Sequence, residues 1–126
     1  MPDVLLVTDA DWIAEQCEAA LGGDYRLHRA RRGADTLEAI EIVEPHLVLL
    51  DLQIGNMGGM AACLAIRQEE DMGRLERRPV IMLLDRGADE FLARRSAADG
   101  WLVKPITPMR LARLVASTLA EEPAPA

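Results

Sequence analysis

Apolar residues recur along the chain in five short runs, each about as long as a β-strand. Four of these runs are almost uninterrupted, which is typical of parallel strands that are covered on both faces. They span residues 4–7, 47–50, 80–84 and 101–103. The run at residues 25–30 alternates between apolar and polar side chains, so we expect this strand to lie nearer an edge of the sheet.

Segments with helical spacing of apolar residues lie between and after the five runs. Their apolar positions fall within residues 13–21, 37–40, 60–67, 91–92 and 111–119. We expect Asp11 to cap the first helix and Gly22–Gly23 to end it. Pro45 should follow the end of the second helix, and the last helix should begin with Thr107 as its cap and Pro108 at its first position.

The alternation of strands and helices with short connections predicts one α/β domain with a doubly wound, five-stranded parallel sheet. A chain of 126 residues, half of them apolar, has room for one such core. We assign residues 1–120 to this domain. Residues 121–126 are charged and rich in Pro and Ala, which indicates a flexible tail or the start of a linker. In open parallel sheets, ligand sites form at the carboxyl ends of the strands.

The net charge and the composition of the chain limit the kinds of ligand and partner that the domain is expected to bind. The formal net charge of −7 disfavours direct binding of nucleic acid, because phosphate backbones are bound by basic surfaces. Cys17 and Cys63 lie far apart in helical segments, which favours buried reduced thiols over a metal site or a disulfide. No signal-like segment begins the sequence, and no apolar run approaches the ~18 residues of a membrane span. We therefore expect a soluble, cytoplasmic domain that does not bind membranes.

Polar residues cluster at the strand ends where a ligand site is expected. In chain order the residues at these ends are Thr8, Asp9, Asp51, Leu84, Asp85, Lys104 and Pro105. Asp9 and Asp51 would repel each other at close range unless a cation offset their charges. Mg²⁺ suits such a pair, because it binds one or two carboxylates and completes its shell with waters and phosphate oxygens. The strand ends therefore predict a magnesium site that serves a phosphorylated ligand.

Lys104 is the only lysine, since the other thirteen basic residues are arginines. A lone lysine at a strand end indicates a need for a compact point charge instead of the planar fork of arginine. Such an ammonium pairs with a carboxylate or with a phosphoryl oxygen.

Four segments of the chain, residues 4–9, 47–51, 79–83 and 100–105, resemble in order and spacing the motifs of receiver domains of two-component response regulators. The resemblance extends over residues 4–119. It implies a flavodoxin-like (βα)5 fold with strand order 2-1-3-4-5. It also implies a signalling domain and not an enzyme on other substrates, with self-phosphoryl transfer and autodephosphorylation as its only chemistry.

The resemblance assigns roles to the residues at the strand ends. Asp51 is implied to be the phosphoacceptor, and the donor to be a sensor histidine kinase or a phosphotransfer protein. Asp9, Asp51 and the backbone carbonyl of Gln53 are implied to hold Mg²⁺. Lys104 is implied to contact the phosphoryl group, and its peptide bond to Pro105 to be cis. Gly59 matches the glycine that opens the third helix.

Three positions depart from the family pattern. Thr8 replaces the first of two acids, which should weaken Mg²⁺ binding, although its hydroxyl can still hold a metal-bound water. Leu84 replaces the Ser or Thr whose hydroxyl usually moves toward the new phosphoryl group and drives the switch. A hydrogen bond to a charged group contributes about 1.5–3 kcal/mol, whereas inverting a 1:99 equilibrium takes about 5.5 kcal/mol, so this loss should blunt the switch without preventing phosphorylation. Asp85 replaces a small residue and adds a negative charge near the entrance for the phosphodonor.

The expected output is a change in the face formed by the fourth helix, the fifth strand and the fifth helix, which could also form a homodimer. Trp101 lies at the position where receivers often carry a mobile aromatic residue, and both a core role and a role in this face stay open. The main alternative is a pseudo-receiver that acts as a phosphorylation-independent interaction or dimerisation module. A small hydrolase or flavoprotein is disfavoured, because the sequence has no Gly-rich cofactor loop or catalytic His pairing.

We expect the histidines, a group of arginines and a group of glycines to have structural roles. His28 and His46 have no second ligand at metal spacing, so we expect both to be structural. The arginines at 74, 77 and 78 should solvate a loop, and the glycines at 55, 58 and 59 should give a flexible loop beside Asp51.

Overall fold

The computed structural model describes residues 1–54 and 58–121. Its centre is a parallel sheet in the order β2-β1-β3-β4-β5. The strands are β1 (Asp3–Val7), β2 (Arg26–Ala30), β3 (Leu47–Asp51), β4 (Val80–Leu84) and β5 (Gly100–Val103). Each of the five apolar runs is therefore a strand, and the expected edge position of the second is confirmed.

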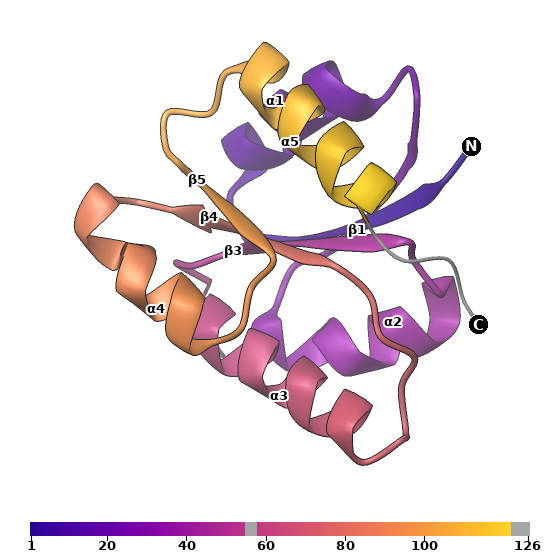
Figure 1. Ribbon diagram of the computed structural model, residues 1–126. Coiled ribbons are helices and arrows are strands. Elements are labelled where there is room, and N and C mark those ends of the chain that lie inside the picture. The colour runs from indigo at the N-terminus through magenta and orange to yellow at the C-terminus, as the bar shows by residue number, and fades with distance from the viewer. Residues whose placement is uncertain (55–57, 122–126) are drawn as a thin grey trace.

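The helices form one layer on each side of the sheet (Figure 1). They are α1 (Asp11–Leu21), α2 (Thr36–Val43), α3 (Gly59–Asp71), α4 (Glu90–Arg95) and α5 (Pro108–Glu121), with short 3₁₀ turns η1 (Gly33–Asp35) and η2 (Gly87–Asp89). α1 and α5 cover one face, and α2, α3 and α4 cover the other. The doubly wound α/β fold is thus confirmed. Within the described residues, no helix is both long and apolar enough to cross a membrane.

Alternation along the strands divides the core in two. Val4 and Leu6 of β1 pack with Ile13 and Leu111 on the side of α1 and α5. Leu5 and Val7 of the same strand pack on the other side, against α2, α3 and α4. All these strand residues are buried, as the uninterrupted apolar runs predict for strands covered on both faces.

The two cysteines behave as expected. Both are free and fully buried. Burial, with the charge of Asp51 in addition, raises the pKa of the Cys17 thiol to about 12. Burial also raises the pKa of the Cys63 thiol to about 11, so both remain protonated near neutral pH.

The start of α1 differs from the expectation. Ala10 occupies the N-cap position and Asp11 is the first helical residue, so the prediction that Asp11 caps the helix is wrong by one position. The Asp11 carboxylate instead accepts hydrogen bonds from Arg29 and Arg31 across the edge of the sheet. These long-range partners are invisible to a local capping rule.

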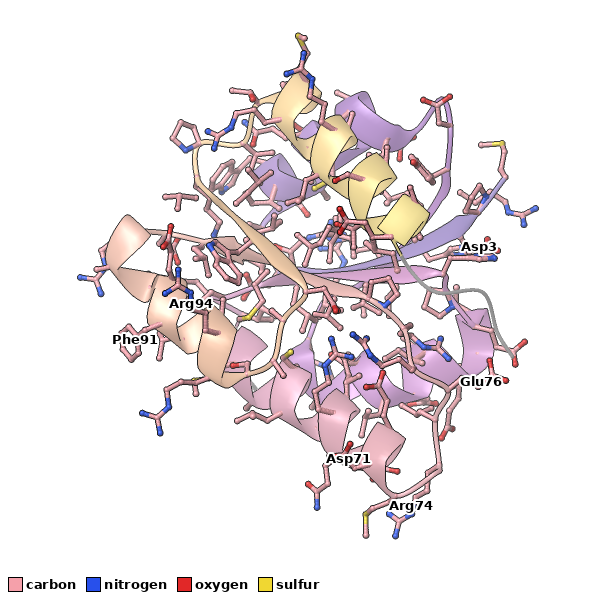
Figure 2. The ribbon with its side chains drawn as sticks, viewed as in Figure 1. Asp3, Asp71, Arg74, Glu76, Phe91 and Arg94 are labelled. Carbon is pink, nitrogen blue, oxygen red and sulfur yellow. The ribbon has the colours of Figure 1, made fainter. Side chains whose placement is uncertain are left out.

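The arginines before β4 also differ from the expectation of a solvated loop. Arg78 is buried and donates to the carbonyl oxygen of Pro45 at 3.1 Å. Arg77 contacts Asp99, which also accepts from Arg67 at 2.6 Å. Arg74 alone fits the expectation, because its side chain is exposed just beyond the end of α3, where it pairs with Glu69 (Figure 2). The segment therefore ties α3 to the amino ends of β4 and β5.

The two histidines both contact Asp3. Asp3, at the amino end of β1 (Figure 2), contacts the His28 ring at 2.9 Å and donates its backbone N–H to His46 at 3.1 Å. Hydrogen bonds from Arg26 and then from His28 lower the pKa of the Asp3 carboxyl to about 2. This cluster lies at the end of the sheet opposite the predicted site.

Gly59 opens α3, with Gly58 at the N-cap position, as the resemblance implies. A Cβ atom at Gly59 would collide with the carbonyl oxygen of Asp51 and would lie 2.9 Å from the Leu52 Cα. The absence of a side chain thus lets α3 begin directly against the end of β3. The expected loop glycine at 55 lies outside the described residues, and α5 extends through Glu121.

We predict that Gly59→Ala lowers the free energy of unfolding by about 1–3 kcal/mol, the usual cost of overpacking a close contact. Urea unfolding followed by circular dichroism measures the change. Gly23→Ala is the matched control, because nothing lies within 4 Å of a Cβ there, and it should leave the stability nearly unchanged. Equal stability of the two variants would contradict the close approach of α3 to β3.

Candidate functional site

The site is built around Asp51, the last residue of β3, whose side chain is only 1% exposed. Both carboxylate oxygens have donors. Oδ1 accepts from the ammonium of Lys104 at 2.6 Å and from the backbone N–H of Gln53 at 3.2 Å. Oδ2 accepts from the hydroxyl of Thr8 at 2.8 Å. A buried carboxylate is thus held by one cation and two neutral donors, which satisfies the rule that buried charges are paired.

Lys104 follows β5 and brings its ammonium across to the end of β3. Its side chain is 10% exposed, and the ammonium also contacts Asp85 Oδ1 at 3.0 Å. Burial opposes the charged form, but the hydrogen bonds and charges of Asp51 and Asp85 outweigh it, so the pKa of Lys104 lies above its usual value. The ammonium therefore stays charged between two carboxylates at neutral pH.

Thr8 turns its hydroxyl into the site and not toward solvent. The residue is fully buried after β1, and its oxygen accepts from the backbone N–H of Ala10 at 3.1 Å while it donates to Asp51. The hydroxyl is thereby committed to Asp51 directly. The hydroxyl oxygen keeps a second lone pair, which can still accept a hydrogen bond from a metal-bound water.

The remaining oxygen donors lie beside Asp51 at the same edge of the sheet. Asp9 follows Thr8 at the carboxyl end of β1 and is exposed, and Gln53 is exposed two residues after Asp51. Within residues 1–54 and 58–121, no group of three or more His, Cys, Asp or Glu side chains is arranged for a metal ion. A metal here would have two carboxylates and a backbone carbonyl, which are hard oxygen donors of the kind that Mg²⁺ accepts.

Leu84 is the last residue of β4, which lies between β3 and β5, and Asp85 directly follows it. Leu84 is fully buried in the apolar cluster on the side of α2, α3 and α4, and its carbonyl accepts the Lys104 backbone N–H at 2.8 Å. Asp85 is the first residue beyond the strand and points its carboxylate at Lys104. The backbone of Leu84 therefore fixes the turn after β5, while its side chain has no polar function.

Trp101 has features of both roles that the sequence left open, a core residue and a residue of the partner-binding face. It is half-buried, packs against the core on the α4 side, and carries the Arg94 guanidinium 5.4 Å from its ring centre. It also lines an open groove of about 690 Å³ along α5 together with Arg110 and Arg113. Phe91 projects outward from α4 (Figure 2).

The sequence reasoning missed Trp12. Its ring is 52% exposed at the start of α1, and its centre lies 5.9 Å from the Lys104 ammonium. The signal that could have found it is its position, because a residue two places into the helix after β1 lies beside the carboxyl end of the sheet. Trp12 thus forms an aromatic wall at the mouth of the site.

The Lys104–Pro105 peptide bond is cis, as the resemblance implies. The family description "response regulator receiver domain" matches residues 4–116. The chain belongs to this family. Receiver domains are the signalling domains of two-component response regulators, and phosphorylation by a kinase is their general role.

Relatives of this receiver domain are longer proteins. The transcriptional regulatory protein AfsQ1 of Streptomyces coelicolor is 31% identical over 109 residues, which cover 84% of this chain and 46% of AfsQ1. The DNA-binding response regulator MtrA of Mycolicibacterium smegmatis is 31% identical over 127 aligned positions, which cover 96% of this chain and 53% of MtrA. The chain thus spans about half the length of the curated relatives it matches.

Solved structures share the receiver fold. A putative response regulator from Chloroflexus aurantiacus superposes with a TM-score of 0.85 and 28% identity, covering 95% of this chain and 98% of that one. The receiver domain of the sensor histidine kinase PA1611 from Pseudomonas aeruginosa has a TM-score of 0.83 and 24% identity, with coverage of 95% and 98%. In that structure a magnesium ion is coordinated in the active site cleft.

We predict that the hydroxyl of Thr8 and the carboxylate of Asp51 are coupled by about 1.5–3 kcal/mol, the usual contribution of a hydrogen bond to a charged group. A double-mutant cycle measures this free energy from the unfolding of wild type, Thr8→Val, Asp51→Ala and the double variant. Valine keeps the shape of threonine, so the cycle isolates the hydroxyl. Additive effects of the two substitutions would show that Thr8 does not stabilise the carboxylate.

Proposed function

We propose that this receiver domain accepts a phosphoryl group on Asp51 from a sensor histidine kinase or a phosphotransfer protein. The observation that supports it best is the buried carboxylate of Asp51 with the ammonium of the chain's only lysine 2.6 Å away. Both lie at the carboxyl edge of the sheet, where open α/β sheets place their ligands. The side chains of Thr8 after β1 and Lys104 after β5, together with the backbone N–H of Gln53, hold the Asp51 carboxylate in place before a phosphodonor arrives.

The proposed transfer conserves atoms and charge. An oxygen of Asp51 attacks phosphorus and forms an acyl phosphate, while the bond from phosphorus to the donor imidazole nitrogen breaks and that nitrogen keeps the electron pair. The Lys104 ammonium then pairs with a phosphoryl oxygen in addition to, or in place of, Asp51. The attacking carboxylate of Asp51 has no proton to lose, so no general base is required.

Asp9, Asp51 and the backbone carbonyl of Gln53 would hold Mg²⁺ in this proposal. When bound, the ion supplies positive charge that offsets the phosphoryl oxygens. Thr8 contributes no charge to this set, so we expect weaker Mg²⁺ binding than in receivers with two leading acids.

The proposed output is a change in the face formed by α4, β5 and α5, where Trp101 and Arg94 are stacked. Partner binding or homodimer formation through this face would carry the signal, without direct binding of nucleic acid by this domain. We take residues 1–120 as the receiver unit and place it in the cytoplasm, where donors made with ATP are available. In the alternative, a pseudo-receiver would use the same face without phosphorylation.

Incubation with Mg²⁺ and acetyl phosphate, followed by intact mass and peptide mapping, tests the proposal. Wild type should gain one phosphoryl adduct on Asp51, and Asp51→Asn should gain none while keeping its fold by circular dichroism. Asp24→Asn, which removes an exposed acid in the turn after α1, is the matched control and should match wild type. An adduct at wild-type level in Asp51→Asn would overturn the assignment, and no adduct in wild type with a matched kinase would favour the pseudo-receiver.

We predict that Leu84 limits the switch, because its buried side chain offers no hydrogen bond to a phosphoryl group. Phosphorylated Leu84→Thr should change the fluorescence of Trp101 more than phosphorylated wild type does. Both proteins need the Trp12→Phe background, since Trp12 lies beside the site and would respond to the adduct directly. Leu84→Val is the matched control, because valine has the shape of threonine without its hydroxyl.

The comparison is made at equal phosphorylation of Asp51, measured by mass. A response of wild type as large as that of Leu84→Thr would show that another element couples the site to the α4-β5-α5 face. A response of Leu84→Val equal to that of Leu84→Thr would assign the effect to lost volume and not to the hydroxyl.

A further inference from the structure

Lys104 is shared between two carboxylates, and only one of them belongs to the proposed phosphoacceptor. We propose that Asp85 is a restraining residue, which holds the Lys104 ammonium against the incoming phosphoryl group and so slows phosphorylation of Asp51. Asp85 would thereby set the resting activity of the site from within the chain. This role rests on the proposed function, and it adds a regulator that the family pattern does not supply.

The contacts of Lys104 leave little of the ammonium for a ligand. It has three N–H donors, one directed to Asp51 Oδ1 at 2.6 Å and one to Asp85 Oδ1 at 3.0 Å. The centre of the Trp12 ring lies 5.9 Å from the nitrogen. A phosphoryl group on Asp51 must therefore share the Lys104 ammonium with Asp85 for as long as that contact persists.

The charges around the ammonium act in the same direction. Two carboxylates face one ammonium, so the three groups carry a net charge of −1 before any donor arrives. Asp85 is 36% exposed and stands on the open side of Lys104, whereas Asp51 is buried. An anionic phosphodonor that approaches from solvent therefore meets the charge of Asp85 first.

The neighbours of Asp85 leave its carboxylate committed to this contact. Arg86, the next residue, pairs with Asp89 at 3.1 Å and caps η2. Lys104 is the only lysine in the sequence. Among the described residues, it is also the cation that forms an ion pair with Asp85. Asp85 is thus positioned toward the site by the turn after β4 and not drawn away by a nearby arginine.

The test compares the initial rate of adduct formation on Asp51 with Mg²⁺ and acetyl phosphate, measured by intact mass. Asp85→Asn keeps the size of the side chain and removes its charge, so the rate should rise about fivefold, the equivalent of a partly exposed ion pair of about 1 kcal/mol. Asp85→Ala should give a similar increase. Glu90→Gln is the matched control, because it removes the same charge from an ion pair five residues away and should leave the rate unchanged.

Two further readouts separate a charge effect from a structural one. The advantage of Asp85→Asn should shrink as salt is raised toward 1 M, where the screening length falls to about 3 Å. With lysine labelled at ¹³Cε, the single Lys104 resonance should move in Asp85→Asn and stay in place in Glu90→Gln. An unmoved Lys104 resonance would overturn the contact on which the restraint depends.

The outcomes distinguish the restraint from the proposed function. An adduct that forms at equal rates in wild type and Asp85→Asn overturns the restraint and leaves Asp51 as the phosphoacceptor. Acceleration in Asp85→Ala without acceleration in Asp85→Asn replaces a charge effect by a steric one and overturns it too. If no variant forms an adduct, the proposed function fails, and the restraint fails with it.

Discussion

The structure depends most on one buried ion pair, Lys104 with Asp51. Each charge is removed from water, and removing one partner of such a pair typically costs about 3–5 kcal/mol because the other is left buried and unpaired. Asp51 is the last residue of β3 and Lys104 directly follows β5, with β4 between these two strands. Thr8, which directly follows β1, adds a hydrogen-bond donor. The pair therefore holds the carboxyl ends of three strands in register, and the same contact gives the site its only ammonium.

The opposite end of the sheet is closed by a second polar network. Asp99 precedes β5 and accepts hydrogen bonds from Arg67 of α3 and from the backbone N–H of Val80. Burial alone would raise the pKa of Asp99, but hydrogen bonds from Arg77 and Val80 and the nearby arginines lower it below its usual value. β5 is thus fixed at both ends by charge, through Asp99 at its start and Lys104 after its end, so the position of Lys104 depends on contacts at both edges of the sheet.

The sequence predicted the strands and the site edge well, because a run of apolar residues and the polar residue that ends it are neighbours in the chain. Asp51 and Lys104 were found in this way, and the resemblance added the cis bond before Pro105. The misses have a common cause. Arg78 is buried against the carbonyl of Pro45, which is 33 residues away in the sequence, and Asp11 pairs with Arg29 of β2 and with Arg31 instead of capping α1. Local rules describe a side chain's neighbours in sequence and not its partners in space.

The three departures at the site act on the same equilibrium. Thr8 satisfies one oxygen of Asp51 with a neutral donor, Asp85 occupies part of the ammonium of Lys104, and Leu84 presents an apolar side chain where an anion would need a donor. Under the proposed function, each stabilises the unmodified site or leaves the phosphorylated one unsupported. The free energy that moves the site must then come largely from outside this domain. Under the proposed function, a kinase or phosphotransfer protein bound over the site would supply it by excluding water, because the pairing between an ammonium and a phosphoryl group strengthens as the local dielectric falls.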